Sequence, residues 1–299
     1  MRVLVTGAAG RVGRAVFVRL ALEHEVLGLD RSPASTVHFT GDVEDEALVR
    51  RALRGVDAIV HTAALHAPHV GIAPAAEFVR INVAATRLLA ERAAAAGIRN
   101  LVFTSTTALY GSAATAAARA GWLDEHLAPR PRTIYHETKL AAEQWLERLA
   151  AASGMRVTAL RMSRCFPEPA PRMALYRLHR GIDARDVADA HACALGGAES
   201  GFRRYVISGA TPFQREDAES LFDAAAQVIR DRAPRLAEAF ARRGWQLPDS
   251  IDRVCDPGLA MKELGWRPRF GFEEVLRMLD ERSSEVLPAG AQWPVRTQT

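Results

Sequence analysis

Tyr135 and Lys139 stand four residues apart in the stretch YHETK, and lysine is rare in this chain. The sequence contains two lysines, Lys139 and Lys262, and meets almost every other need for positive charge with arginine. If a helix begins near residue 135, the phenol and the ammonium are neighbours on one face. A phenol is a poor base at neutral pH because its ordinary pKa is about 10. A nearby ammonium favours the phenolate, so the pair predicts a tyrosine general base with a lowered pKa.

Lysine also suits this position because its compact head can reach ribose hydroxyls, whereas the flat fork of arginine would not fit the same space. An ordinary surface pair on a helix is the alternative. The scarcity of both residue types in the chain makes a chance pairing at this spacing uncommon.

A run of hydroxyl side chains, Thr104 to Thr107, follows a short apolar stretch that reads as a strand. A hydroxyl at the carboxyl edge of a central parallel strand points into the crevice where doubly wound sheets bind ligands. Such runs also occur at strand ends for structural reasons, so the run alone leaves both readings open.

A glycine-rich loop, TGAAGRVG, connects the first strand directly to a helix. Gly7, Gly10 and Gly13 permit a tight turn, close approach of backbone amides to a pyrophosphate, and close packing of helix on strand. Arg11 and Val12 lie at the start of that helix, whose N-terminus favours negative charge. The loop therefore predicts a dinucleotide site.

Asp30 ends the second strand, at the distance from the loop where a carboxylate can accept both hydroxyls of an adenosine ribose. An acid there repels a 2′-phosphate, so NAD is favoured over NADP. Arg31 beside it keeps NADP use open, and the structural alternative for Asp30 is a turn residue before Ser32 and Pro33.

The elements that must position these residues alternate between short β-branched runs and longer helical patterns, which is typical of βαβ units. The expected strands are 2–6, 25–30, 58–63, 100–105 and 156–162, with helices at 13–23, 46–55, 82–97 and 139–154. This pattern predicts an α/β fold: a doubly wound parallel-sheet Rossmann domain with a smaller, mostly helical C-terminal substrate domain. We expect the NAD-binding domain at 1–165. We expect residues 166–299 to form a mainly substrate-binding region that is interleaved with the last Rossmann elements. This region includes a strand and turn at 205–213, and its last part, 283–299, is expected to be a loose tail.

Composition narrows the class of protein. The chain has 299 residues and a formal net charge of +4 that is spread along the sequence, so we expect no nucleic acid partner. The three cysteines show no CxxC spacing, which argues against a disulfide framework or a metal site and favours a reducing cytoplasm. The first residues read as a strand without a leader, and no apolar run has the length of a membrane span.

Taken together, the chain resembles the extended short-chain dehydrogenase/reductase family, the NAD-dependent epimerase/dehydratase branch. The resemblance rests on the glycine loop, Asp30, GDV (41–43), HTAA (61–64), Asn82 with Thr86, FTSTTALYG, YxxxK, RDVA (185–188) and the late DPGLAMKELGWRPRFGFEEVL. It implies that Tyr135 takes a proton from a substrate hydroxyl as hydride leaves for the nicotinamide. Thr106 then binds the same oxygen, and Lys139 holds the nicotinamide ribose and tunes Tyr135.

The resemblance also implies the cofactor site. We expect it to comprise Gly7, Gly10, Arg11, Val12, Gly13, Asp30, Arg31, Asp42, Val43, Thr62, Ala63, Ala64, Asn82, Thr104, Tyr135 and Lys139. His61 and Asn82 are expected to shape this site rather than perform chemistry, and a structural role for His61 is equally open. Family members commonly dimerise through two helices from each subunit, here 84–96 and the helix after Tyr135, so a homodimer is expected.

Two departures from the family pattern bear on the reaction. Dehydratases usually follow the catalytic threonine with an Asp-Glu pair, whereas Thr107 and Ala108 stand here, which counts against dehydration. The segment between the strand ending near Arg161 and the RDVA motif is about half the usual length, and its CFPEP stretch resembles uronate dehydrogenases. We expect Thr107, Ser163, Arg164, Arg177 and Arg180 to contact substrate, whereas Cys165 is read as a core thiol rather than an acid.

These observations predict an NAD-dependent oxidoreductase or epimerase acting on a sugar or nucleotide-sugar hydroxyl, and epimerisation is slightly favoured. A net dehydrogenase of a free sugar or uronic acid is the alternative. A non-catalytic NAD-binding regulatory protein is a second alternative, against which the complete set of Thr106, Tyr135 and Lys139 argues.

Overall fold

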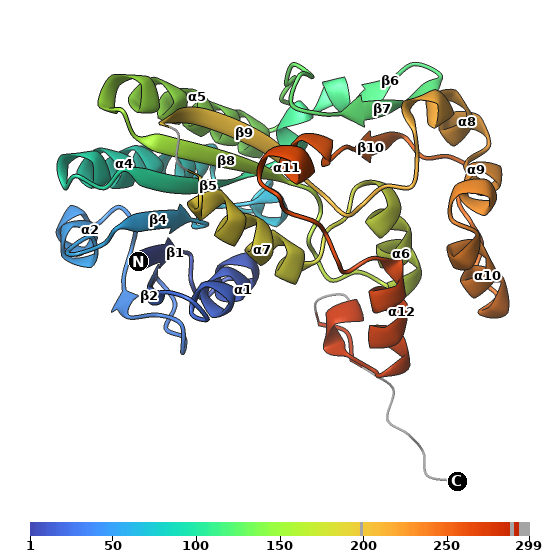
Figure 1. The fold of residues 1–299 in the computed structure, drawn as a ribbon, viewed down its shortest axis with the longest axis horizontal. Helices are drawn as coiled ribbons and strands as arrows, with labels where there is room; N and C mark the ends of the chain where they lie inside the picture. The colour runs from blue at the N-terminus through green and yellow to red at the C-terminus, as the bar shows by residue number, and fades with distance from the viewer. Residues whose placement is uncertain (198–199, 288–289, 293–299) are drawn as a thin grey trace, which may run out of the picture.

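A seven-stranded parallel sheet forms the centre of the molecule in this computed structural model, which describes residues 1–197, 200–287 and 290–292 (Figure 1). The strand order is β3-β2-β1-β4-β5-β8-β9. The strands are β1 (Arg2–Thr6), β2 (Glu25–Asp30), β3 (Phe39–Thr40), β4 (Ala58–His61), β5 (Asn100–Thr106), β8 (Arg156–Met162) and β9 (Gly201–Ile207). The order reverses between β1 and β4, and in such sheets ligands bind beyond the carboxyl ends of the strands at that reversal.

Helices cover both faces of this sheet. On one face lie α2 (Glu46–Ala52), α4 (Ala85–Ala95) and α5 (Ile134–Ser153), and on the other α1 (Arg11–Leu20) and α7 (Ala184–Leu195). Between α3 (Ala75–Val79) and α4, residues 80–84 form a π-helical turn. Central strands are buried along nearly their whole length, which explains why their sequences are continuous apolar runs rather than alternating ones. The predicted fold class is confirmed.

Helix α5 begins earlier than the sequence pattern suggested. Thr133 caps it by accepting a hydrogen bond from the backbone N–H of His136 at 3.4 Å, and Gly154 ends it in the left-handed conformation at φ 67°. Tyr135 and Lys139 therefore both lie in its first two turns. The strand of the strand and turn expected at 205–213 begins four residues earlier: β9 spans 201–207, because all seven residues pair with 156–162 in β8.

The later part of the chain builds a second core beside the sheet (Figure 1). Its helices are α6 (Ala170–His179), α8 (Ala218–Asp223), α9 (Ala225–Arg232), α10 (Pro234–Arg242) and α12 (Phe272–Asp280), and α11 (Gly258–Glu263) packs near β9. A small sheet of order β10-β7-β6 joins β6 (Thr115–Ala116), β7 (Arg119–Leu123) and β10 (Arg253–Cys255). The sequence did not indicate this sheet, because strands of two to five residues are too short to show a periodicity.

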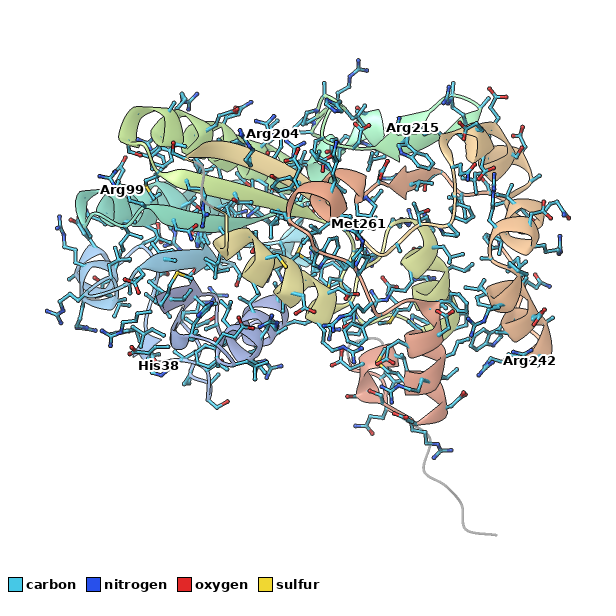
Figure 2. The ribbon with its side chains drawn as sticks, viewed as in Figure 1. His38, Arg99, Arg204, Arg215, Arg242 and Met261 are labelled. Atoms are coloured by element: carbon cyan, nitrogen blue, oxygen red, sulfur yellow. The ribbon has the colours of Figure 1, made fainter. Side chains whose placement is uncertain are left out.

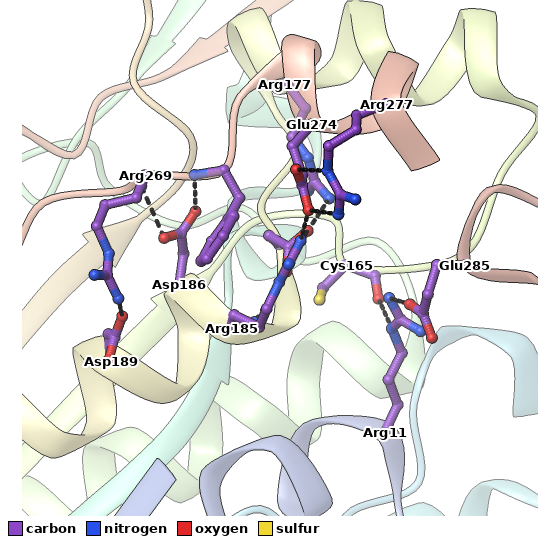
Figure 3. Close-up of polar contacts among 12 residues, drawn as sticks. Arg11, Cys165, Arg177, Arg185, Asp186, Asp189, Arg269, Glu274, Arg277 and Glu285 are labelled. Atoms are coloured by element: carbon purple, nitrogen blue, oxygen red, sulfur yellow. Dashed lines mark hydrogen bonds and ion pairs between the residues drawn. The ribbon is translucent and has the colours of Figure 1, made fainter. Parts of the chain in front are cut away.

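Polar contacts fasten the late segment to the Rossmann half (Figure 3). The carboxylate of Asp186 in α7 accepts hydrogen bonds from the backbone N–H groups of Arg269 and Phe270 at 2.8 and 3.0 Å. Arg11, at the start of α1, pairs with Glu285 at 2.6 Å. Contacts from α7 and from the start of α1 thus hold the late segment against the Rossmann half.

Residues 284–287 do not form the loose tail that was expected from residue 283. Ser283 caps a short 3-10 turn, Ser284–Val286, and Val286 is 1 % exposed because it packs into the second core. Positions 288–289 and 293–299 of the expected tail lie outside the described residues.

Arginine side chains lie on the surface of both the Rossmann half and the later part of the chain; Figure 2 labels Arg99, Arg204, Arg215 and Arg242. Several are paired with carboxylates, such as Arg204 with Glu147 at 2.8 Å. Across residues 1–197, 200–287 and 290–292, no helix has the length and apolar character needed to cross a bilayer.

Candidate active site

A cavity of about 630 Å³ opens at the carboxyl edge of the sheet, between the Rossmann half and the second core. It brings together most of the residues that the sequence singled out. Those that line it are Gly7, Gly10, Arg11, Val12, Gly13, Asp30, Arg31, Asp42, Val43, Thr62, Ala63, Ala64, Thr104, Thr106, Thr107, Tyr135, Lys139, Ser163, Arg164 and Arg180. Asn82 and Arg177 do not line it.

The glycine loop forms a tight cradle at one end of the cavity. Gly7 has φ +71°, a backbone conformation that residues with a side chain rarely adopt. A Cβ on Gly13 would lie 2.0 Å from the Gly7 carbonyl oxygen. Helix α1 begins after Gly10, and within the part of the chain that the structure describes no side chain caps its N-terminus. Its first backbone N–H groups are therefore available to an anion such as a pyrophosphate.

The carboxylate of Asp30 is held rigidly beside this cradle. Its Oδ2 accepts a hydrogen bond from the Ala9 backbone N–H at 3.0 Å, and its Oδ1 accepts one from Ser32 N–H at 2.8 Å. Asp42 lines the same end and accepts from the Glu44 N–H at 3.2 Å. A glycine cradle flanked by fixed carboxylates fits the phosphates and the adenosine ribose of a dinucleotide.

Thr106, Tyr135 and Lys139 meet in the middle of the cavity, and each is nearly buried. The Thr106 side chain lies near the Tyr135 phenol and favours its ionised form. The Lys139 ammonium donates to the Thr104 carbonyl oxygen at 2.6 Å and lies 3.9 Å from the centre of the Phe103 ring. Its remaining N–H bonds are free to serve a ligand in the cavity.

Burial dominates the titration of both ionisable members. It raises the pKa of Tyr135 to about 12, opposed by the nearby Thr106 side chain. It lowers the pKa of Lys139 to about 7, opposed by the charge of Glu143. The pKa of Tyr135 is therefore raised, not lowered as the sequence suggested, because burial disfavours the phenolate.

Arginine side chains gather at the other end of the cavity. Arg164 from the β8–α6 loop, Arg180 after α6 and Arg253 from β10 all line it. The described lining residues at this end include no carboxylate, but each arginine pairs with one outside the lining. Arg180 and Arg253 contact Asp252 at 3.3 and 2.6 Å, and Arg164 donates to Glu168. The Ser163 hydroxyl, buried in the same wall, makes no hydrogen bond to any of the described residues.

A family model for the NAD dependent epimerase/dehydratase family matches residues 3–174. This chain belongs to that family. The match covers the glycine loop, Asp30, Thr106, Tyr135 and Lys139, so it confirms the predicted family and, at the level of the family, the predicted NAD cofactor.

Curated relatives from this family carry out different reactions. A UDP-glucose 4-epimerase of Streptomyces lividans is 32 % identical over 164 residues, covering 51 % of this chain and 48 % of its own. An L-arabinose 1-dehydrogenase (NAD(P)(+)) of Haloferax volcanii is 34 % identical over 172 residues, covering 54 % of this chain and 66 % of its own. The chain thus matches about half to two thirds of the length of these relatives.

The whole fold also matches a solved structure. A short-chain dehydrogenase/reductase superfamily protein from Agrobacterium tumefaciens with bound NAD superimposes with a TM-score of 0.71, covering 95 % of this chain and 99 % of that one. The identity is 21 %, so the comparison establishes the shared fold.

Asn82 does not face the cavity, which corrects its prediction as a cofactor residue. Its side chain accepts from the Leu65 N–H at 2.8 Å and donates to the Leu65 carbonyl oxygen and the Thr138 hydroxyl at 2.9 and 3.1 Å. Asn82 therefore fastens the loop after β4 to helix α5. His61 is likewise internal: it bonds Thr6 at 2.6 Å, and burial lowers its pKa to about 3.

Arg177 is a second correction. It is 3 % exposed, donates to Asp183 at 3.0 Å, and points into the protein rather than the cavity. Helix α6 carries Tyr176 into the cavity wall, and adjacent residues on a helix face different directions. Cys165 lines the cavity as a buried group whose pKa is raised by desolvation, which keeps it a neutral thiol.

The structure adds lining residues that the sequence did not indicate. Arg253 and Cys255 arrive on β10, and His66 and His69 follow β4. The one feature of the sequence that could have indicated Arg253 is its position just before the DPGLAMKELGW segment. Among the described residues, no group of three or more histidines, cysteines, aspartates or glutamates is arranged to hold a metal ion.

Proposed function

We propose that this chain is an NAD-dependent oxidoreductase that moves hydride between a sugar or nucleotide-sugar hydroxyl carbon and the nicotinamide, and that it acts as an epimerase. The observation that carries the proposal is one shared cavity. Its cofactor end holds the glycine cradle and Asp30, its middle holds Thr106, Tyr135 and Lys139, and its far end holds arginines.

NAD, when bound, supplies the hydride acceptor and donor. The residues that would hold it are the backbone of the glycine loop for the pyrophosphate, Asp30 for the adenosine ribose, and Lys139 for the nicotinamide ribose. Asp30 suits NAD better than NADP, because its charge opposes a 2′-phosphate.

Tyr135 removes the proton from the substrate hydroxyl while Thr106 holds the same oxygen by a hydrogen bond. With a pKa of about 12 in the buried site, Tyr135 needs additional positive charge close by to act as a base near neutral pH. Lys139 contributes that charge whenever it carries its proton, and the oxidised nicotinamide ring is also positively charged. The proton then returns from Tyr135 to the oxygen when hydride returns.

The arginine-lined end of the cavity supports a substrate with an anionic group, either a sugar carboxylate or the phosphates of a nucleotide sugar. Arg164, Arg180 and Arg253 are each at least about a quarter exposed, so they can reorient toward a ligand. Ser163 offers an unpaired hydroxyl beside them.

Dehydration is not part of the proposal. Thr107 and Ala108 line the cavity where a dehydratase would place its acid pair, and neither can protonate a leaving hydroxyl. A net dehydrogenase of a free sugar or uronic acid is the second candidate. Only 21 residues, 163–183, separate β8 from α7, which favours a small substrate.

The first experiment incubates the protein with NAD and a panel of free sugars, uronic acids and UDP- or dTDP-sugars, following NADH absorbance and product identity together. Interconversion of two sugars without accumulating NADH supports epimerisation. Stoichiometric NADH with one oxidised product would instead establish the dehydrogenase.

The matched control is Tyr135→Phe, which removes the phenolic hydroxyl and keeps the ring. We expect turnover to fall by about 10²–10⁴-fold with NAD affinity unchanged. Full turnover in this variant would refute the assignment of Tyr135. An inactive wild-type protein that still binds NAD would favour the non-catalytic regulatory alternative. The homodimer through α4 and α5 and the cytoplasmic location stay predictions.

A further inference from the structure

A buried ion pair lies directly behind the catalytic side chains. Glu143 in α5 and Arg161 in β8 are each 1 % exposed. The guanidinium of Arg161 donates from Nε to both carboxylate oxygens at 3.1 and 3.2 Å, and from a terminal nitrogen to Oε2 at 2.7 Å. An ion pair buried this completely is expensive to desolvate, so stability alone does not account for it.

The pair connects the elements that carry the active site. Ser105, which lies between Thr104 and Thr106 in β5, donates its hydroxyl hydrogen to Glu143. Arg161 also donates to the Tyr110 hydroxyl at 3.0 Å, and Tyr110 donates to the Asp124 carbonyl oxygen at 2.6 Å. One network thus joins β5, α5, β8 and the 3-10 turn Thr107–Tyr110.

Glu143 stands one helical turn after Lys139, on the same face of α5. We propose that Glu143, held by Arg161 and Ser105, is a positioning residue that keeps Lys139 in its ammonium form and fixes β5 against α5. This rests on the proposed function of Lys139. Glu143 is not among the site residues that the sequence analysis predicted.

The electrostatics of the neighbourhood support this. Burial lowers the pKa of Lys139 to about 7, and the charge of Glu143 opposes that shift. The other titratable groups around the ammonium are Tyr135, one turn earlier on α5, and His61 on β4, which is neutral because its pKa is about 3. Arg161 on β8 lies behind Glu143. Of these groups, Glu143 is the one whose charge favours the ammonium form of Lys139.

Replacing Glu143 by glutamine removes this negative charge and leaves the Arg161 cation buried without its partner. Both changes disfavour a second cation nearby, so Lys139 should lose its proton at a lower pH. We expect its titration midpoint to fall by at least about one pH unit, a tenfold smaller ratio of ammonium to amine at a given pH.

The chain offers an unusually clean measurement, because Lys139 and Lys262 are its only lysines. Protein labelled with ¹³C at lysine Cε gives two resonances, which Lys262→Arg assigns. The midpoint of Lys139 is read from pH titrations of the wild type and Glu143→Gln. Lys262 is exposed and serves as the internal reference, with no change expected.

Two further variants separate charge from packing. Tyr110→Phe removes a hydroxyl that contacts Arg161 without changing any charge, so the midpoint of Lys139 should stay within about 0.3 unit of the wild type. The double variant Glu143→Gln/Arg161→Met removes both charges at similar volume, which such buried pairs often tolerate. Its midpoint should still fall, by less than in Glu143→Gln, and it replaces the single variant if that one does not fold.

An unchanged Lys139 midpoint in the folded Glu143→Gln or double variant would overturn the proposal. Activity adds a second arm: the alkaline limb of the kcat/KM profile should move to lower pH, with kcat falling more than KM changes. Because the titration needs no substrate, it still decides the role of Glu143 if the proposed sugar chemistry fails.

Discussion

Gly13→Ala tests whether the cofactor cradle depends on the close approach of α1 to β1. A Cβ at residue 13 would lie 2.0 Å from the Gly7 carbonyl oxygen, 2.7 Å from its carbonyl carbon and 2.9 Å from the Thr62 hydroxyl oxygen. Real Cβ contacts stay beyond 3.0 Å, so the new methyl group requires a movement of about 1 Å. Two of the three neighbours are backbone atoms, which cannot rotate away.

The magnitude follows from two opposing effects. Overpacking against fixed backbone costs about 3 kcal/mol. Alanine gains about 1 kcal/mol over glycine in a helix, which leaves a net loss of about 2 kcal/mol. For a chain of this size we expect the melting temperature to fall by about 4 °C. Displaced loop amides also lose hydrogen bonds to a charged pyrophosphate, which should weaken NAD binding by at least about tenfold.

Thermal melting and calorimetric titration with NAD measure the two effects. The matched control is Gly196→Ala, since Gly196 has φ −80° and ψ −10° and its nearest neighbour to an added Cβ is the Cys193 carbonyl oxygen at 3.4 Å. This control should change stability by no more than about 0.5 kcal/mol and leave NAD affinity intact. If Gly13→Ala melted and bound NAD like the wild type, the argument from close approach would be refuted.

Asp30→Asn should shift the preference from NAD toward NADP by about 30-fold, because it removes a negative charge that opposes the roughly doubly charged 2′-phosphate. Competitive titration with both cofactors measures the ratio of their affinities, and an unchanged ratio would contradict the role of Asp30. Three buried histidines predict acid sensitivity, since burial lowers the pKa of His61 to about 3 and those of His179 and His191 to about 4. Between pH 6.5 and about 4 the unfolded chain binds protons that the folded chain excludes, so stability is full above pH 6.5 and falls on acidification by about 1.4 kcal/mol per pH unit per histidine. Melting curves from pH 4 to 7 test this, and His191→Gln should reduce the slope by about one third; an equal slope would argue that His191 titrates normally.

Local spacing carried most of the correct predictions. The glycines at 7, 10 and 13 and the Tyr135–Lys139 pair act over a single turn or helix, so their geometry follows from the chain itself. Buried parallel strands carry continuous apolar runs instead of alternating ones, which made the main sheet visible in the sequence. These features were sufficient to predict the fold class and the family.

The far end of the cavity depended on tertiary structure. Arg253 reaches it only because β10 pairs with β7, more than 120 residues earlier in the chain, and Arg177 leaves it because α6 turns that face inward. Pairing between such short strands has no local signature in the sequence.

The ionisation of Tyr135 and Lys139 was also decided by the tertiary structure. The sequence by itself determined that Tyr135 and Lys139 are neighbours, which favours a lowered tyrosine pKa. Packing of both side chains away from water reverses that shift, and it brings Glu143 and Arg161 together beneath them. Side-chain order along a helix is encoded locally, whereas desolvation depends on every element that closes over the site.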